Sequence, residues 1–172
     1  NTMISATFSM VGKDMTMAGT SVDPTKDAAS VNQPFDSYSG ALSLGNAAAA
    51  MTALATITGI DFSISNSVTP TYVVGSAATP QLEFGMATIE GTITAYFEDA
   101  SLINRFINET TSAFAVTVND PSGVSNYTFH FPRVKINGAT VPVEGMTGSR
   151  IITLPFVALY DTAENSSIEI IR

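Results

Sequence analysis

Short runs in which every second residue is apolar constrain the fold of this chain more than any other feature. In the clearest run, residues 88–97, apolar and polar positions alternate: Ile89, Ile93, Ala95 and Phe97 against Thr88, Glu90, Thr92, Thr94 and Tyr96. Side chains of a β-strand point to opposite faces in turn, so a period of two predicts a strand with one buried face. The same period recurs at residues 4–10, 60–65, 114–118 and 127–131, which predicts a mainly β protein.

Turn signals divide the segments between these runs. Gly45-Asn46 predicts a hairpin whose second strand is long, although the run Ala47–Ala50 could instead open a helix. Residues 66–85 contain prolines and small polar residues and are expected to form a loop.

Two segments near the C-terminal end are also expected to be strands. Residues 150–160 are almost continuously apolar, which is typical of a central strand or of one buried on both faces. Pro155 lies inside that run and has no backbone N–H, so the strand must lie at an edge or be bulged there. Asn137-Gly138 predicts a tight turn before it, and residues 166–172 are expected to form a last short strand.

One segment has the spacing of a helix. Leu102, Ile103, Phe106 and Ile107 form one apolar stripe at helical spacing, and Asp99 is a favourable N-cap residue. We expect a short helix over about residues 99–109, with the stripe packed on the sheet.

A long loop completes the predicted fold. Residues 13–35 are polar, contain prolines and have no steady period, so we expect a loop that a partner orders. Together the segments predict a β-sandwich or partly closed barrel of about seven to nine strands, with one flanking helix and this loop. Residues 1–172 are expected to form a single domain. Because the chain begins in a strand-like run, we expect it to be the C-terminal part of a longer chain.

The composition favours a protein that works in contact with neighbours. Charged residues make up 13% of the chain, against about a quarter in typical domains, so much of the polar surface is neutral. The net charge of −8 and the scattered basic residues argue against nucleic-acid binding, which requires clusters of Lys and Arg. No apolar run is long enough to span a membrane, so insertion of this domain into a membrane is not expected.

Residues suited to catalysis or metal binding are sparse. The chain has no cysteine and one histidine, His130, which strand alternation directs to the polar side, opposite to Phe129 and Phe131. The adjacent acids Glu98 and Asp99 lie at a helix start, where negative charge is stabilising. Nucleophile-elbow, EF-hand and phosphate-loop patterns are absent. We therefore expect no enzyme activity, no metal and no cofactor, and a role in assembly or binding.

The order of these segments resembles that of a known family. The phrases ITGIDFSISNS, IEGTITAYFED, FPRVKI, VPVEG and ITLPFVALYD follow one another along the chain, with the expected helix between the second and the third. This succession, together with NTMISATFSMVGKDM at the start, resembles the tail-tube (major tail) proteins of long-tailed bacteriophages. That family is similar in turn to the tube proteins of type VI secretion.

The resemblance implies a structural subunit of a virion that is assembled in the host cytoplasm. It implies hexameric rings that stack into a hollow tube, through whose β-lined lumen DNA passes without specific binding. The partners would be further copies of the chain, and other tail proteins at the tube ends. The long loop would reach an adjacent ring or protomer, and its charged residues are the candidates for that contact: Lys13, Asp14, Asp23, Lys26 and Asp27.

The resemblance also directs attention to polar sheet faces. Carboxylates in a lumen would repel the phosphate backbone and let DNA slide. The polar sides of the two best-alternating segments supply the lumen-facing candidates: Asp61, Ser63, Ser65, Thr88, Glu90, Thr92 and Thr94. The same residues could instead form ordinary exposed sheet surface or a subunit interface.

Two other classes of function stay open. The chain could be a different virion or secretion-tube structural protein, such as a decoration or baseplate protein. It could also be a β-sandwich adhesin or carbohydrate-binding module. That second class uses clustered aromatic residues, whereas this chain has no Trp and its Tyr residues are dispersed.

Overall fold

The protein is built mainly of antiparallel strands. The computed structural model describes residues 3–172 except 22, 29–30, 32, 39, 48–49, 55, 77 and 143–148. The elements formed by the described residues are, in chain order, β1 (Ala41–Gly45), β2 (Met51–Ala53), β3 (Ile57–Ser65), β4 (Val68–Pro70), β5 (Leu82–Phe84), β6 (Thr88–Tyr96), α1 (Ser101–Ile107), β7 (Ser112–Asn119), β8 (Asn126–Ile136), β9 (Ile151–Ala158) and β10 (Glu169–Ile171).

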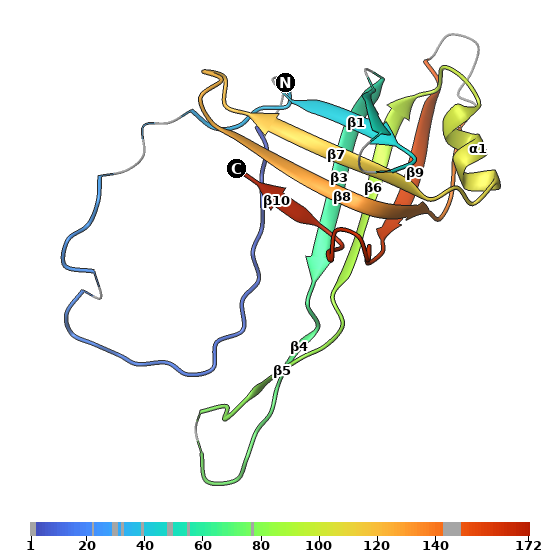
Figure 1. Ribbon diagram of the computed structural model, residues 1–172. Helices are drawn as coiled ribbons and strands as arrows, with labels where there is room; N and C mark the ends of the chain where they lie inside the picture. Colours follow the sequence, from blue (N-terminus) through green and yellow to red (C-terminus); the bar gives the residue numbers. More distant parts are fainter. Residues whose placement is uncertain are drawn as a thin grey trace.

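One antiparallel sheet holds most of these strands, in the order β2-β1-β7-β8-β9-β6-β3, with β10 paired to β8. The long strand β8 joins two parts of the sheet, since it pairs with β7 along most of its length and with β9 only through Val134–Ile136. Figure 1 shows β3, β6 and β9 crossing β1, β7 and β8 at a steep angle, so the sheet folds over on itself. The described strands do not close into a barrel, because β2 and β3 stay at the two ends of the order. The predicted mainly β, sandwich-like fold with one helix is confirmed.

The core lies inside this fold and is dominated by phenylalanine rings. Phe114 of β7, Phe131 of β8 and Phe156 of β9 are almost fully buried. The ring centroids of Phe114 and Phe131 are 4.4 Å apart, and those of Phe114 and Phe156 are 4.8 Å apart. Phe62 of β3 reaches the same cluster, with its ring centroid 5.2 Å from that of Phe131. Such aromatic pairs add about 0.5–1.5 kcal/mol each to the stabilisation from area burial.

The helix begins slightly later than predicted. The N–H of Ser101 donates a 2.8 Å hydrogen bond to Oδ1 of Asp99, which lies one residue before the N-cap Ala100. Hydrogen bonds from the Ser101 hydroxyl and from its backbone N–H lower the pKa of Asp99. Asp99 thus satisfies one of the N–H groups that a helix start leaves unpaired.

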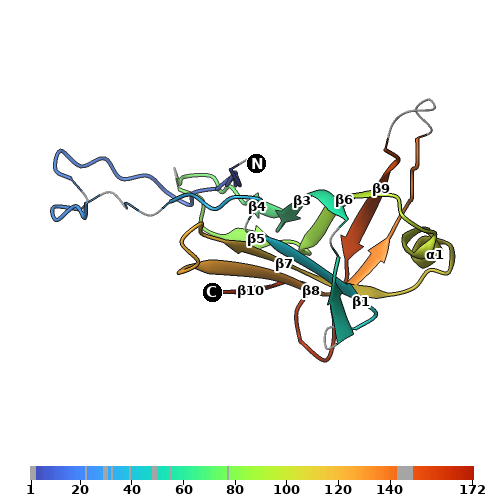
Figure 2. The ribbon, with the colours of Figure 1, turned by 90° about the horizontal axis from the view of Figure 1, so that it is seen from above.

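The apolar stripe of α1 is divided between core and surface. Leu102 is buried in the core and Ile103 packs against it, whereas Phe106 and Ile107 are exposed. Figure 2 shows α1 at one end of the molecule. Arg105 fixes this end, because its Nη1 donates hydrogen bonds to Asn46 Oδ1 at 2.7 Å and to Ser112 Oγ at 3.0 Å.

The strand expected at residues 4–10 is not formed. The described residues from 3 to 35 make an extended, exposed arm, which Figure 1 shows swinging away from the sheet and returning to β1. Its base is held by a bridge between Met3 and Asp36 and by a 3.1 Å hydrogen bond from Ile4 N–H to the Phe35 carbonyl. Alternation alone does not make a strand, because strand N–H and C=O groups need a neighbouring strand. The long loop expected at residues 13–35 is confirmed by the described part of that range.

Two further predictions need correction. The hairpin at Gly45-Asn46 is present, but its second strand, β2, has three residues, and the chain then passes to β3 at the opposite end of the sheet. The alternative of a helix at Ala47–Ala50 falls partly outside the described residues. The expected loop at residues 66–85 instead contains a two-stranded ribbon, β4–β5, that projects from the sheet in Figure 1.

Pro155 lies in a central strand opposite a bulge. β9 pairs with both β6 and β8, and its buried side chains alternate with more exposed ones, so it is central but not buried on both faces. Ile136 lies opposite Phe156 whereas Thr140 lies opposite Thr153, which leaves one extra residue in the strand beside Pro155. Asn137-Gly138 is therefore part of this bulge and does not reverse the chain as predicted.

Candidate functional site

The candidate lumen-facing residues lie on one face of two paired strands. The register of β3 with β6 sets these residues opposite one another: Asp61 and Thr92, Ser63 and Glu90, Ser65 and Thr88, Gly59 and Thr94. Residues directly opposite one another in an antiparallel pair share a face. The structure therefore brings all the predicted polar residues onto one surface, here called the polar face.

Gly91 of β6 allows the paired strands β3 and β6 to pack closely on the Phe156 ring of the core. It is opposite Phe62 on one side and Phe156 on the other. A Cβ atom at Gly91 would overlap the Asp61 carbonyl oxygen and lie 2.6 Å from Cζ of Phe156. Only glycine leaves room for the Phe156 ring beneath the polar face.

The polar face continues onto β9 and β8. Thr153, Pro155 and Val157 of β9 lie opposite Thr94, Thr92 and Glu90, and Lys135 of β8 lies opposite Val157. A shallow groove of about 420 Å³ runs between the strands, and Asp61, Glu90 and Pro155 are among its lining residues. The sequence does not indicate that β9 contributes to the polar face. Residues 150–160 are apolar on both faces of the strand, so no alternation with a period of two is visible there.

The charge on the polar face is unequally distributed. Asp61 and Glu90 are exposed and lie diagonally across the β3–β6 ladder, a placement that sets side chains about 7–8 Å apart. The nearest base on the same face, Lys135, points to Glu109, with its Nζ 2.6 Å from the Glu109 carbonyl oxygen and 3.6 Å from Oε2. The β3–β6 end of the face is therefore acidic.

The candidate contact residues of the long loop lie apart from the polar face. Lys13, Asp14, Asp23, Lys26 and Asp27 are all exposed on the arm. Asp14 and Asp23 accept hydrogen bonds from nearby backbone N–H groups, of Met15 at 2.7 Å and of Thr25 at 3.1 Å. The Lys13 carbonyl accepts a 3.1 Å hydrogen bond from the N–H of Thr79, which joins the arm to the loop of the β4–β5 ribbon.

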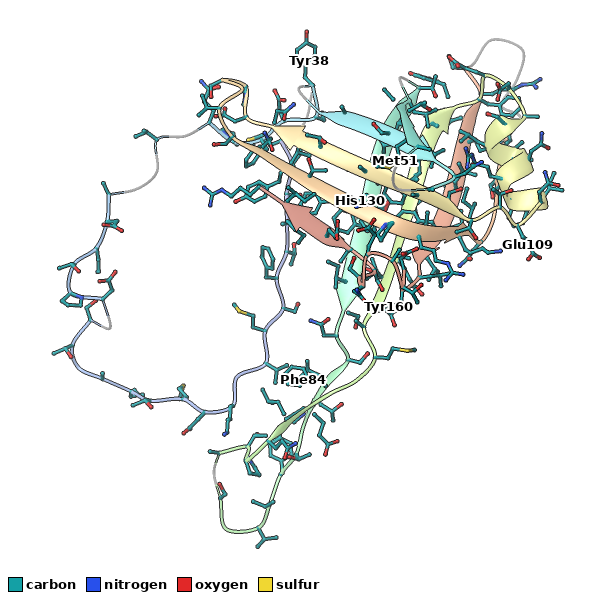
Figure 3. The ribbon with its side chains drawn as sticks, in the orientation of Figure 1. Tyr38, Met51, Phe84, Glu109, His130 and Tyr160 are labelled. Carbon is teal, nitrogen blue, oxygen red and sulfur yellow. The ribbon has the colours of Figure 1, made fainter. Side chains whose placement is uncertain are left out.

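The arm and the ribbon expose large apolar side chains. Phe8, Met10, Met15 and Met17 on the arm are each at least 80% exposed, and Val74 and Phe84 on the ribbon are similarly uncovered. Figure 3 shows Phe84 on the ribbon, well away from the sheet. Apolar side chains gathered on projecting segments are typical of contact surfaces.

His130 does not lie on an exposed polar surface. It is 9% exposed, and its Nδ1 lies 3.0 Å from Oε2 of Glu169 on β10. β10 pairs beside β8 in the sheet with Glu169 opposite His130, so the Glu169 carboxylate lies on the same face as the imidazole and next to it. No local sequence pattern indicates this contact, since Glu169 is 39 residues from His130 along the chain.

Neither a metal site nor a membrane-spanning helix is found in the part of the chain that the structure describes. No group of His, Cys, Asp and Glu residues there is arranged to hold a metal ion. No helix there is long and apolar enough to cross a membrane.

Solved structures share this fold at low sequence identity. The sheath/tube terminator of the PVC extracellular contractile injection system matches with a TM-score of 0.61 and 12% identity, covering 83% of this chain and 100% of that one. The PVC sheath–tube complex matches with a TM-score of 0.59 and 11% identity, over 82% of this chain and 93% of that one. The SPP1 tail tube matches with a TM-score of 0.54 and 12% identity, over 72% and 75% of the two chains.

Comparison with protein-family models shows which family the chain belongs to, which structural likeness at such low sequence identity does not. Comparison with curated proteins gave no match. The family model described as "Phage tail tube protein" matches residues 1–158, which is nearly the whole chain. The chain therefore belongs to the phage tail tube protein family, as a structural subunit of the virion's tail.

Proposed function

We propose that six copies of this chain form a ring, that the rings stack into a hollow tube, and that the polar face lines its lumen. The observation that carries this proposal is the common register of the polar residues on β3 and β6. The opposite face of the same strands packs on the core, where Ile89 and Ile93 of β6 are buried and Phe62 of β3 is partly buried. The polar face is therefore the surface available to a water-filled channel. The role is structural and needs no catalytic group.

The charge of the polar face suits the passage of DNA. Asp61 and Glu90 repel phosphate groups, and neutral Ser and Thr side chains offer no point charge that would hold them. In a ring of six, each carboxylate recurs around the lumen, which multiplies the repulsion. DNA then moves through the tube without specific binding.

The arm supplies the contact between neighbouring rings or protomers. Its apolar residues have little cover within one chain, and water is excluded from them only if another copy packs there. Lys13, Asp14, Asp23, Lys26 and Asp27 lie among those apolar residues and set the register of the contact by charge. This assembly takes place in the host cytoplasm before the virion is complete.

A second candidate is a role at the end of the tube. The matched structures include the sheath/tube terminator of an extracellular contractile injection system and the tube terminating cap of the anti-feeding prophage. A subunit at the tube end would expose one ring face to a different tail protein. The same polar face would then line only the terminal ring.

Electron microscopy of the purified chain tests this proposal. The proposal predicts hollow cylinders built of rings, whereas a terminator predicts single rings that do not extend. The double variant Asp61→Lys/Glu90→Lys should still form tubes, because both side chains are exposed, but those tubes should retain short DNA duplexes at low salt. Tubes whose DNA retention is unchanged by the double substitution would exclude the polar face from the lumen.

A further inference from the structure

The segment from Ile4 to Met10 has the sequence of a strand but no strand partner in the described structure. Apolar Ile4, Ala6, Phe8 and Met10 alternate with Ser5, Thr7 and Ser9. Phe8 and Met10 are 81% and 90% exposed, so one face of this potential strand is uncovered. The backbone is extended, and the one described hydrogen bond of this segment is at its start, from Ile4 to Phe35.

The strand β3 has a free edge of matching length. Within the described residues it ends the sheet order and pairs only with β6. It has nine residues, whereas β2 and β10 have three each, as do β4 and β5 of the two-stranded ribbon. A seven-residue strand spans about 23 Å, so β3 alone can pair with all of it.

The edge of β3 also lacks the usual protection against strand addition. Residues 60–65 contain no proline and no lysine, and Asp61 is their only charge. Natural edge strands are commonly blunted by such residues or by being very short. On the core side Ile64 is 44% exposed, which leaves apolar surface at this edge uncovered.

The two patterns are complementary. In either strand direction, the apolar residues of the segment can lie beside Ile60, Phe62 and Ile64, while Ser5, Thr7 and Ser9 extend the polar face beside Asp61, Ser63 and Ser65. The segment carries no charge, so it places no like charge next to Asp61. Any register that places the apolar residues of the segment on the core side also places its polar residues on the polar face.

We propose that residues 4–10 of one chain add to the β3 edge of a second copy as a β-strand, extending its polar face. The inference rests on the proposed function, because the tube supplies the second copy. A second copy is favoured over the same chain because the segment, although tethered at Phe35, does not lie on its own β3. Strand addition would bury Phe8 and the exposed side of Ile64 together.

Cysteine cross-linking between two copies tests the pairing directly. The chain has no native cysteine, and directly opposed residues lie about 4.5–5.5 Å apart at Cβ, close to disulfide range. Chains carrying Ser5→Cys, Thr7→Cys or Ser9→Cys are each assembled with chains carrying Ser63→Cys and oxidised mildly. At least one mixture should give a covalent dimer that is lost when assembly is prevented.

The matched control replaces the acceptor at the other end of the sheet. Thr52→Cys on β2 is exposed as Ser63 is, and should give no dimer with any of the three donors. Intact tubes without a Ser63 dimer, or with equal dimer at Thr52, would overturn the proposal. Cross-linking within one chain that carries both cysteines, at dilutions where no tube forms, would also overturn it.

Proline variants separate this inference from the proposed function. Consecutive N–H groups of a strand point to opposite sides, so either Ala6→Pro or Thr7→Pro must remove a bond to β3. At least one should abolish assembly while leaving the unfolding midpoint of the monomer unchanged, because the arm is exposed. If both variants form tubes as readily as the unmodified chain, strand addition is wrong and the tube function stands. If the unmodified chain forms no tubes, both proposals fail.

Discussion

The folded sheet and the arm of residues 3–35 contain similar alternating runs, yet only the sheet forms strands from them. Phe131 in the run 127–131 is fully buried, whereas Phe8 in the run 4–10 is 81% exposed. The difference is the neighbour, because β8 has strands on both sides and residues 4–10 have none within the described structure. Alternation therefore shows that a segment is competent to form a strand, and a partner decides whether it does.

The largest contrast should appear in limited proteolysis of the unassembled chain. Trypsin should cut after Lys13 and Lys26 in the arm on the order of 100-fold faster than after Arg105, Arg133 or Lys135, because exposed segments need no unfolding to be cleaved. Mass spectrometry of a digestion time course identifies the order of the cuts. Assembly should slow the arm cleavages selectively, and equal rates at all sites would remove the distinction between the two regions.

Matched phenylalanine truncations test the same distinction in free energy. Phe131→Ala removes a ring packed against Phe114 and Phe62 and should lower the free energy of unfolding by about 3–5 kcal/mol. Phe8→Ala removes an exposed ring and should change it by less than about 0.5 kcal/mol. Urea unfolding of the monomer followed by circular dichroism measures both. A large loss from Phe8→Ala would show that the arm packs on its own sheet.

Glycine substitutions examine how tightly the sheet is packed beneath the polar face. Gly91→Ala places a methyl group against the Phe156 ring and should cost about 1–3 kcal/mol of unfolding free energy. Gly59→Ala on the neighbouring strand meets no atom within 4 Å and should be neutral or slightly stabilising, because alanine restricts the unfolded chain. Equal changes in unfolding free energy for Gly91→Ala and Gly59→Ala would mean that β6 is not packed tightly on the core at Gly91.

The smallest effect concerns pH and the turn between β7 and β8. Hydrogen bonds from the Ser122 hydroxyl and from its backbone N–H lower the pKa of Asp120. A carboxyl whose folded pKa is depressed contributes stability above its unfolded pKa of about 3.9, and this stability is lost as the pH falls through the folded pKa. Asp120→Asn should therefore flatten the fall in unfolding temperature below about pH 4. If the unfolding temperature of the variant falls below pH 4 as steeply as that of the unmodified chain, a group other than Asp120 causes the fall.

The sequence predicted the strands that have a clear period of two and a partner nearby. β3, β6, β7 and the first half of β8 were located correctly, and so was the helix, to within a few residues. Alternation assigned Asp61 and Ser63 to the polar side of one strand and Glu90 and Thr92 to the polar side of another. The pairing of β3 with β6, which joins these sides into one face, is known only from the structure. What could not be foreseen depends on contacts distant in sequence.

Three features illustrate that limit. β10 places Glu169 beside His130, a contact that no local pattern indicates. Asn137-Gly138 has turn chemistry but lies in a bulge, because the chain after β8 meets β9 again at the bridge between Thr140 and Thr153. The last turn of α1 leaves Ile107 exposed, since only Leu102 and Ile103 of the stripe belong to the core or pack against it. In each case the tertiary neighbour overrides the local preference.

A helical reconstruction of the assembled tube would show which surface of the subunit lines the lumen. We expect a hollow tube with Asp61 and Glu90 directed into the lumen, and with the arm of each chain packed on another copy. A reconstruction in which the polar face of β3 and β6 lies on the outer wall of the tube would contradict it.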